Sequence, residues 1–427
     1  MSPLGHFLRI SKPFLQYQKC WRSFKPFVEN QSHGVRRSLS SPSPYKSAEL
    51  RHTEMASLYG AWIMENREEL ENVTRLSDNV IRVLGQNPGK FTLQGTNTYV
   101  IGSQNPHILI DTAEGLDSYI PVLKSALESP TNATQPDVSD IILSHWHHDH
   151  VGGIPSVLTL LKELWEGRNA DKPYTPPRLH KYPVAEGANG EHLDSHWNKL
   201  PKLIEELPKD LYTHTPDGGV FHDLSDNQVF EDAAGSPVLR VLHTPGHTVD
   251  SVALHIPPDR ALYTADTVLG HGTAVFEDLA TYLASLNRML HFGAPAASPP
   301  VAGGDTDLEY VSLYPGHGAV VVDGRETIAT YIKHRLEREG QVLAALQSPI
   351  PAEFLDTNAG TAPFWTTWNL VRILYKTYPE TLWLPAARGI HLHLKKLEGD
   401  GFVQCVGGEG KDCQWKLLVS PPSTPSL

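Results

Sequence analysis

The segment Ser144–Ile154 reads Ser-His-Trp-His-His-Asp-His-Val-Gly-Gly-Ile and carries the pattern His-x-His-x-Asp-His. Imidazole and carboxylate groups at this short spacing are the ligands that a borderline metal such as zinc prefers. The apolar run Asp140–Leu143 before the segment predicts a buried strand, and Gly152-Gly153 precedes a helical pattern. A polar loop that is merely rich in histidine is the alternative. The pattern predicts a strand-to-helix loop on which metal ligands converge.

Three later segments repeat one design, in which an apolar strand ends in a polar residue, and in the first and third of them glycine is adjacent to that residue. They cover residues 239–248, 261–266 and 313–318. Glycine and proline let the backbone turn sharply at a strand end, so that one side chain can project. A site for two metals needs about seven ligands, including an oxygen that can bridge. The candidates are His145, His147, Asp149, His150, His247, Asp266 and His317, with Asp266 as the expected bridge.

These motifs, in this order, resemble the metallo-β-lactamase superfamily of metal hydrolases over roughly residues 80–318. The resemblance implies an α/β fold, a four-layer αββα sandwich, and two Zn²⁺ ions per chain. It also implies that His145, His147 and His247 hold one metal and that Asp266 bridges to the other. Asp149, His150 and His317 would hold the second metal.

A narrower resemblance involves the segments Val83–Tyr99, Leu269–Leu279 and Tyr331–Glu339. They are similar to two subgroups of the superfamily. One is the β-lactamase-like protein 2 group, whose animal members are mitochondrial endoribonucleases. The other is the group of fungal thioesterases that release polyketides from acyl carrier proteins. Gln86 and Lys90 in the first segment favour the thioesterases.

This resemblance predicts a hydrolase in which a metal-activated hydroxide attacks a carbonyl carbon or a phosphorus. A metal then stabilises the oxyanion that develops. We expect Asp149 to be the catalytic residue that orients the nucleophile and moves a proton. The first hypothesis is hydrolysis of an acyl or polyketide thioester, carried by an acyl carrier protein or by a small molecule. The alternative is an endoribonuclease that cleaves single-stranded RNA in mitochondria, and hydrolysis of other thioesters or of lactams stays open.

Composition limits the partners of the chain. The 427 residues carry a net charge of −12, and residues 55–427 alone carry −18. Such an acidic body argues modestly against RNA, because phosphate contacts need local positive charge. The sequence contains no apolar run near the length of a membrane span, so we expect no membrane partner. Cys20, Cys405 and Cys413 lie away from the metal motifs, which argues against thiolate ligands and for a reducing compartment. A bridge between Cys405 and Cys413 across a hairpin is the alternative.

The chain divides into four predicted parts. Residues 1–54 form a basic leader rich in serine and arginine, with the composition of a mitochondrial transit peptide. A disordered extension, or a start at Met55, is the alternative, and the protein would then be cytoplasmic. Residues 55–326 form the catalytic domain, with insertions at 171–221 and 291–307 that we interpret as loops. Residues 327–419 form a helical, winged-helix-like module, and residues 420–427 form a disordered tail.

Hydrophobic periodicity predicts the individual elements. The expected strands are 80–84, 98–101, 107–111, 141–143, 178–182 and 309–313. The expected helices are 116–127, 154–164, 200–207, 328–336, 365–375 and 382–397, followed by a two-stranded ribbon at 402–405 and 414–417. His192, His196, His214 and His222 lack a strand-end context, so we expect packing or solvated roles for them. His243 is adjacent to the site, where we expect it to pack or to support a ligand. For His271 we expect a surface or packing role, and lining the pocket or donating to a leaving group is the alternative.

Overall fold

A computed structural model describes residues 68–128, 132–184, 198–232, 235–293, 308–354 and 364–418. Several predictions concern residues outside these ranges and stay untested. They are the leader 1–54 with Cys20, the tail 420–427, most of the second insertion, and the roles of His192 and His196.

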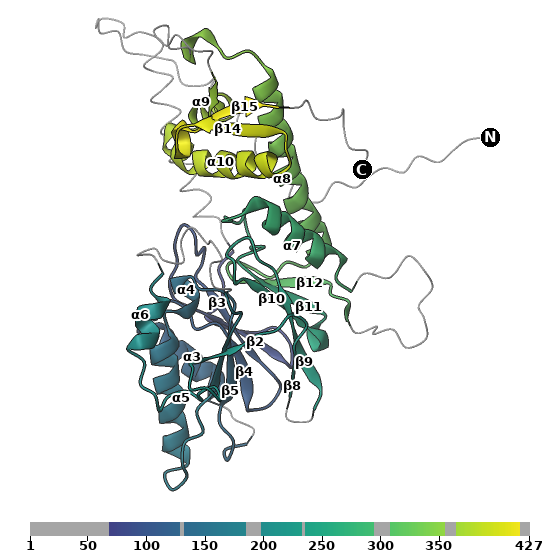
Figure 1. Cartoon of the computed structure of the whole chain (residues 1–427). Helices are drawn as coiled ribbons and strands as arrows, with labels where there is room; N and C mark the ends of the chain where they lie inside the picture. Colours follow the sequence, from purple (N-terminus) through teal and green to yellow (C-terminus); the bar gives the residue numbers. More distant parts are fainter. Residues whose placement is uncertain are drawn as a thin grey trace, which may run out of the picture. The chain divides into compact units, whose positions relative to one another are not determined.

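Two sheets form the part of the chain that the sequence predicts to be the catalytic domain (Figure 1). The first has seven strands in sequence order, and its last four are mutually parallel. They are β1 (Val73–Arg75), β2 (Val80–Leu84), β3 (Asn97–Ile101), β4 (His107–Ile110), β5 (Val138–Leu143), β6 (Arg178–Lys181) and β7 (Phe221–Asp223). The second has the order β12 (Ser312–Pro315), β11 (Ala261–Ala265), β10 (Val252–Ile256), β9 (Pro237–His243) and β8 (Val229–Glu231), with β11 and β12 parallel.

Three apolar layers separate these sheets and their helices into the predicted αββα order. Alternate residues of one strand enter different layers, because side chains along a strand point to opposite faces. Ile141 packs outward against helices α3 (Tyr119–Leu127) and α5 (Ile154–Arg168), whereas Ile142 packs inward against the second sheet. The outer face of the second sheet packs against α7 (Leu279–His291) and the first half of α8 (Gly324–Gln347). Two shorter helices, α4 (His148–Val151) and α6 (Leu200–Glu205), complete this part.

Several element boundaries differ from the predictions, most of all those of α8, which was expected over residues 328–336 only, and two of the differences have a clear physical reason. Helix α3 begins at Tyr119 rather than Leu116, which places Pro121 in the first turn. Proline is tolerated there because the first amide groups of a helix have no partner within the helix. Strand β12 begins at Ser312 rather than Glu309, since its parallel partner β11 begins at Ala261, directly opposite.

The C-terminal module has a three-stranded sheet, not the predicted two-stranded ribbon. Trp365 and Thr366, expected to begin a helix, pair instead with the hairpin as a third strand. The Thr366 hydroxyl then caps the following helix by accepting from Asn369 N. The elements are β13 (Trp365–Thr366), α9 (Thr367–Leu374), α10 (Trp383–Gly399), β14 (Val403–Gly407) and β15 (Gln414–Leu417). Short 3₁₀ turns are η1 (Pro257–Asp259), η3 (Ala352–Phe354), η4 (Glu380–Leu382) and η5 (Gly410–Asp412).

Helix α8 contributes to two cores. Ile328 and Tyr331 in its first half belong to the layer beneath the second sheet. Val342, Leu343 and Leu346 in its last turns belong to the core of the C-terminal module. Among the described residues, none of the helices has the length and apolar character that crossing a membrane requires.

Candidate metal centre

The candidate ligands lie where strands of both sheets end. Asp266 follows β11 and His317 follows β12 after one glycine, while His247 follows β9 across a short turn. His145 comes two residues after β5, and His147, Asp149 and His150 lie on or beside the short helix α4. The ends of these strands point to one edge of the sandwich, because β9, β11 and β12 run in the same direction. The predicted strand-to-helix loop is confirmed.

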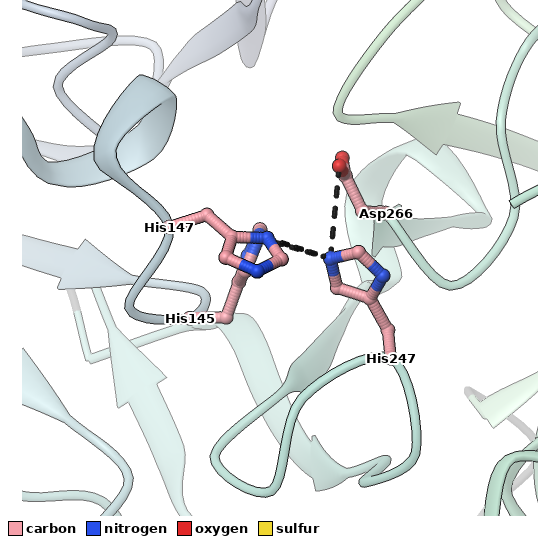
Figure 2. Close-up of side chains that lie close together, drawn as sticks. All are labelled: His145, His147, His247 and Asp266. Atoms are coloured by element: carbon pink, nitrogen blue, oxygen red, sulfur yellow. Dashed lines mark hydrogen bonds and ion pairs between the residues drawn. The ribbon is translucent and has the colours of Figure 1, made fainter. Parts of the chain in front are cut away.

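The structure brings all seven predicted side chains together in two groups that share Asp266. The first group consists of His145, His147, His247 and Asp266 (Figure 2). Its three imidazoles point at one another: His247 Nε2 lies 3.2 Å from His145 Nε2 and 3.0 Å from His147 Nδ1. His145 Nε2 and His147 Nδ1 are 3.0 Å apart. Asp266 Oδ2 lies 3.8 Å from His247 Nε2.

The second group consists of Asp149, His150, Asp266 and His317. His317 Nε2 lies 3.1 Å from Asp149 Oδ2 and 3.2 Å from Asp266 Oδ2. His150 Nε2 lies 3.3 Å from Asp266 Oδ1 and 3.4 Å from His317 Nε2. The carboxylate of Asp266 therefore faces both groups, in the bridging place expected for it.

Hydrogen bonds behind three of the five imidazoles set which nitrogen of those rings faces the centre. His247 Nδ1 donates to the carbonyl of Val275 at 2.9 Å, and His317 Nδ1 donates to the carbonyl of Gly95 at 3.3 Å. His150 Nδ1 donates to Asp111 Oδ2 at 2.7 Å. A ring that donates from Nδ1 presents the lone pair of Nε2, so these three rings are fixed in the form that binds a metal.

This arrangement fits metal ions. Tetrahedral zinc with bonds of about 2.0–2.1 Å to nitrogen places its ligands about 3.3 Å apart. The nitrogen separations of 3.0–3.4 Å match that spacing. Three nitrogen lone pairs that converge in a buried site also repel one another unless a cation or proton lies between them. The donor set of imidazoles and carboxylates is the set that zinc prefers.

Charge differs between the two groups. Burial and the neighbouring imidazoles hold the pKa of His145 well below its ordinary value, and burial lowers the pKa of His147 to about 3. In the second group burial opposes protonation, but the carboxylates of Asp266 and Asp149 outweigh it and raise the pKa of His317 to about 9. Protons and metal compete for the same lone pairs. The second group therefore attracts positive charge more strongly than the first.

Residues 91–317 match the family described as the Metallo-beta-lactamase superfamily, and this match covers more than half of the chain. The chain belongs to the metallo-beta-lactamase superfamily. Members of this superfamily are generally hydrolases that bind metal ions. Residues 366–415 match the Beta-lactamase associated winged helix domain, which confirms the predicted winged-helix module.

Two relatives within the superfamily represent the two predicted subgroups. The Beta-lactamase-like protein 2 homolog of Drosophila melanogaster is 35% identical over 334 residues, which cover 78% of this chain and 92% of the relative. The Atrochrysone carboxyl ACP thioesterase of Claviceps purpurea (strain 20.1) is 33% identical over 282 residues, covering 66% of this chain and 70% of the relative. The solved structure of a Beta-lactamase domain protein from Burkholderia ambifaria has a TM-score of 0.52 at 18% identity, over 81% of this chain and 93% of that one. This likeness shows a shared fold.

Asp111 supports the candidate ligand His150, a role that was not predicted from the sequence. Its buried carboxylate accepts hydrogen bonds from Ser144 N at 2.8 Å, Ser144 Oγ at 2.7 Å, Tyr263 OH at 2.5 Å and His150 Nδ1. Asp111 directly follows the buried strand β4, which is the same strand-end context as that of Asp266. That context was visible in the sequence. The convergence of Ser144, Tyr263 and His150 on one carboxylate was not, because they come from three distant segments.

Two glycines make room for the ligands. A methyl group at Gly316 would lie 2.5 Å from Asp266 Oδ1 and 3.0 Å from His150 Cε1. Gly246 has a φ of +127°, and a methyl group there would lie 2.3 Å from the backbone of Tyr282. Any larger residue at either position would displace the neighbouring ligand or helix.

The remaining predicted side chains lie outside the two groups. His243 stacks on Tyr182, with ring centroids 3.7 Å apart, and its Nε2 donates to the carbonyl of Val249. His214 and His222 donate to backbone carbonyls, and His271 belongs to neither group. Cys405 and Cys413 are free thiols, so the alternative of a bridge between them is wrong for this structure.

Proposed function

We propose that this chain is a zinc-dependent thioesterase that hydrolyses an acyl or polyketide thioester carried by an acyl carrier protein. The seven side chains described above would hold two zinc ions. The similarity to relatives named as acyl carrier protein thioesterases supports this substrate class. The observation that carries the proposal is a pair of exposed apolar side chains on the two loops whose carbonyls bind His247 and His317.

These two side chains are Phe91 and Val275. Phe91 is 70% exposed, the largest fraction for any large hydrophobic residue among those described, and Val275 is 60% exposed. Each belongs to a loop that holds a candidate ligand. The loop of Phe91 supplies the Gly95 carbonyl to His317, and Val275 supplies its own carbonyl to His247. An acyl chain that covered these side chains would gain about 25 cal/mol for each Å² of apolar surface removed from water.

The residues around the centre suit hydrolysis of such a thioester. Bound zinc ions would supply a water of lowered pKa and an electrostatic partner for the carbonyl oxygen. The side chain of Asp149 is 24% exposed against 13% for Asp266, so Asp149 is the more accessible of the two carboxylates to a substrate from solvent. Asp149 orients the attacking water, accepts its proton and returns that proton to the leaving sulfur. Water and thioester thereby yield a carboxylic acid and a thiol.

The test compares two substrates on the full chain supplied with zinc. One is an acyl thioester, presented on an acyl carrier protein and on N-acetylcysteamine, and the other is a labelled single-stranded RNA. Asp149→Ala should abolish thioester hydrolysis, whereas Asp117→Ala, which removes an exposed carboxylate outside both groups, should not. Thioester that stays intact with every acyl chain tested contradicts the proposal.

An RNA substrate is the second candidate function. The winged-helix module and the similarity to the β-lactamase-like protein 2 homologs favour it. The net charge of −12 argues against it, because phosphate contacts require positive charge. RNA cleavage that depends on Asp149, with the thioester intact, would reverse our order of the two functions.

A further inference from the structure

The loop between β11 and α7, residues 267–278, connects helix α8 to the candidate metal centre. The loop lacks regular secondary structure, so its shape depends on side chains that bind its backbone. On one side, the Val275 carbonyl accepts the hydrogen bond from His247 Nδ1 at 2.9 Å. On the other side, two residues of α8 bind the loop.

Arg335 of α8 makes the closest of these contacts. Its guanidinium donates to the Ala274 carbonyl at 2.8 Å and to the hydroxyl of Thr273. It also lies over the ring of Phe276, with Cζ 4.8 Å from the ring centroid. Arg335 therefore contacts the residues on both sides of Val275, Ala274 and Phe276. The Ala274 carbonyl is one peptide unit from the Val275 carbonyl that orients His247.

Tyr331, one turn earlier on α8, binds the first part of the same loop. Its hydroxyl accepts from Leu269 N at 3.2 Å and donates to the Gly272 carbonyl at 3.0 Å. Gly270 N donates in turn to the His317 carbonyl at 2.9 Å. The two side chains of α8 thus hold the loop at its start and beside Val275.

We propose that Arg335, assisted by Tyr331, is a positioning residue for His247. It holds the Val275 carbonyl where that carbonyl selects the ring form with the Nε2 lone pair toward the metal. Without this support the carbonyl can move, and His247 can then rotate or take the other ring form, which presents a hydrogen instead of a lone pair. The inference rests on the metal site proposed above and not on the substrate.

The test measures cobalt binding, because Co²⁺ occupies zinc sites and gives a visible spectrum. The full chain, freed of metal, is titrated with Co²⁺ as wild type and as Arg335→Met, Arg335→Lys, Tyr331→Phe and His247→Asn. His247→Asn identifies the cobalt equivalent that depends on His247. Arg335→Met should bind that same equivalent about tenfold more weakly, the lower end of the usual cost of losing a residue that supports a ligand. Arg335→Lys keeps the charge and one donor, so it should recover part of the affinity.

Arg338→Met is the matched control. Arg338 lies one turn further along α8, and its guanidinium packs over the ring of Tyr375, 4.6 Å from the centroid, in the C-terminal module. It should leave cobalt binding unchanged. If Arg335→Met does not fold, as judged by circular dichroism, Arg335→Lys and Tyr331→Phe decide the question.

The outcomes separate this inference from the proposed function. Wild-type cobalt affinity in the folded Arg335 and Tyr331 variants, or an equal loss in Arg338→Met, overturns the positioning role. The positioning role is also overturned if the Arg335 variants lose affinity only for the cobalt ion that His247→Asn still binds. A wild-type chain that binds no cobalt overturns the metal site and this inference together. Cobalt binding without thioester hydrolysis removes only the proposed substrate.

Discussion

Replacing Asp111 by asparagine changes one buried atom at the point where most of the hydrogen bonds behind the site converge. Oδ1 of Asp111 accepts from Ser144 N, and Oδ2 accepts from Ser144 Oγ, Tyr263 OH and His150 Nδ1. An asparagine must turn its amide hydrogens toward one of these two sets. The hydroxyls of Ser144 and Tyr263 can rotate to accept, but the backbone N–H of Ser144 cannot.

The magnitude follows from the donors left unpaired. If the amide replaces Oδ2, His150 can accept its hydrogen only by moving its own proton to Nε2, which removes the lone pair from the centre. If the amide replaces Oδ1, the buried N–H of Ser144 loses its acceptor, which costs about 1–3 kcal/mol. Loss of the carboxylate charge weakens the remaining bonds as well, so we expect about 2–4 kcal/mol of lost stability. Metal affinity should fall about 10–100-fold.

Urea unfolding and metal titration of the full chain measure both effects. Tyr263→Phe removes one of the four donors and should lose less stability than Asp111→Asn. Asp117→Asn, on an exposed residue of the following loop, should lose none. An Asp111→Asn protein within 0.5 kcal/mol of wild type, roughly the ordinary range for surface substitutions, would refute this reasoning if its metal affinity were also unchanged.

Three further predictions concern single positions. Gly316→Ala should weaken metal binding at least about tenfold, since the methyl group would lie 2.5 Å from Asp266 Oδ1. The control is Gly340→Ala on α8, which has no neighbour within 4 Å and should stabilise the chain by about 0.5–1 kcal/mol. Equal metal affinities in the two variants would contradict this prediction. Phe91→Ser should raise KM for a long-chain acyl thioester several-fold and leave kcat within about twofold. The control Val322→Ser, which removes a side chain that is 68% exposed, should change neither constant. A fall in kcat alone would show that Phe91 has another role. Burial, together with the positive charges of Arg335, Arg338 and Lys396, lowers the pKa of His393 to about 3. In the unfolded chain the pKa of His393 is about 6.5, so below pH 6.5 this side chain binds a proton more readily in the unfolded state than in the folded state. Stability from His393 is therefore full above pH 6.5 and declines as the pH falls, and His393→Leu should remove up to about 2 kcal/mol of the stability difference between pH 7 and pH 5. Urea titrations at both pH values measure this difference, and an unchanged one would exclude His393 as its source.

Much of the candidate site could be predicted because each ligand follows a local rule. Four of the ligands lie within six residues of one another, namely His145, His147, Asp149 and His150. The other three, His247, Asp266 and His317, each follow an apolar strand. Strand ends with glycine or proline place one side chain outward regardless of what lies opposite. The prediction that Trp365 and Thr366 begin a helix was wrong, because their structure depends on a distant segment and not on a local rule. Their pairing with β15 is a long-range contact, and it overrides the helical pattern of the segment.

The sequence by itself determined the family and the identity of the seven candidate ligands, because these depend on residue types at fixed spacing, and the layered fold was implied by the resemblance to that family. Only the tertiary structure decided which atoms face each other. Asp111 gathers donors from Ser144, Tyr263 and His150, which lie 33, 152 and 39 residues away along the chain. Arg335 reaches the Ala274 carbonyl from 61 residues away. A hydrogen bond requires placement within a few tenths of an ångström, and only the packing of the complete chain provides it.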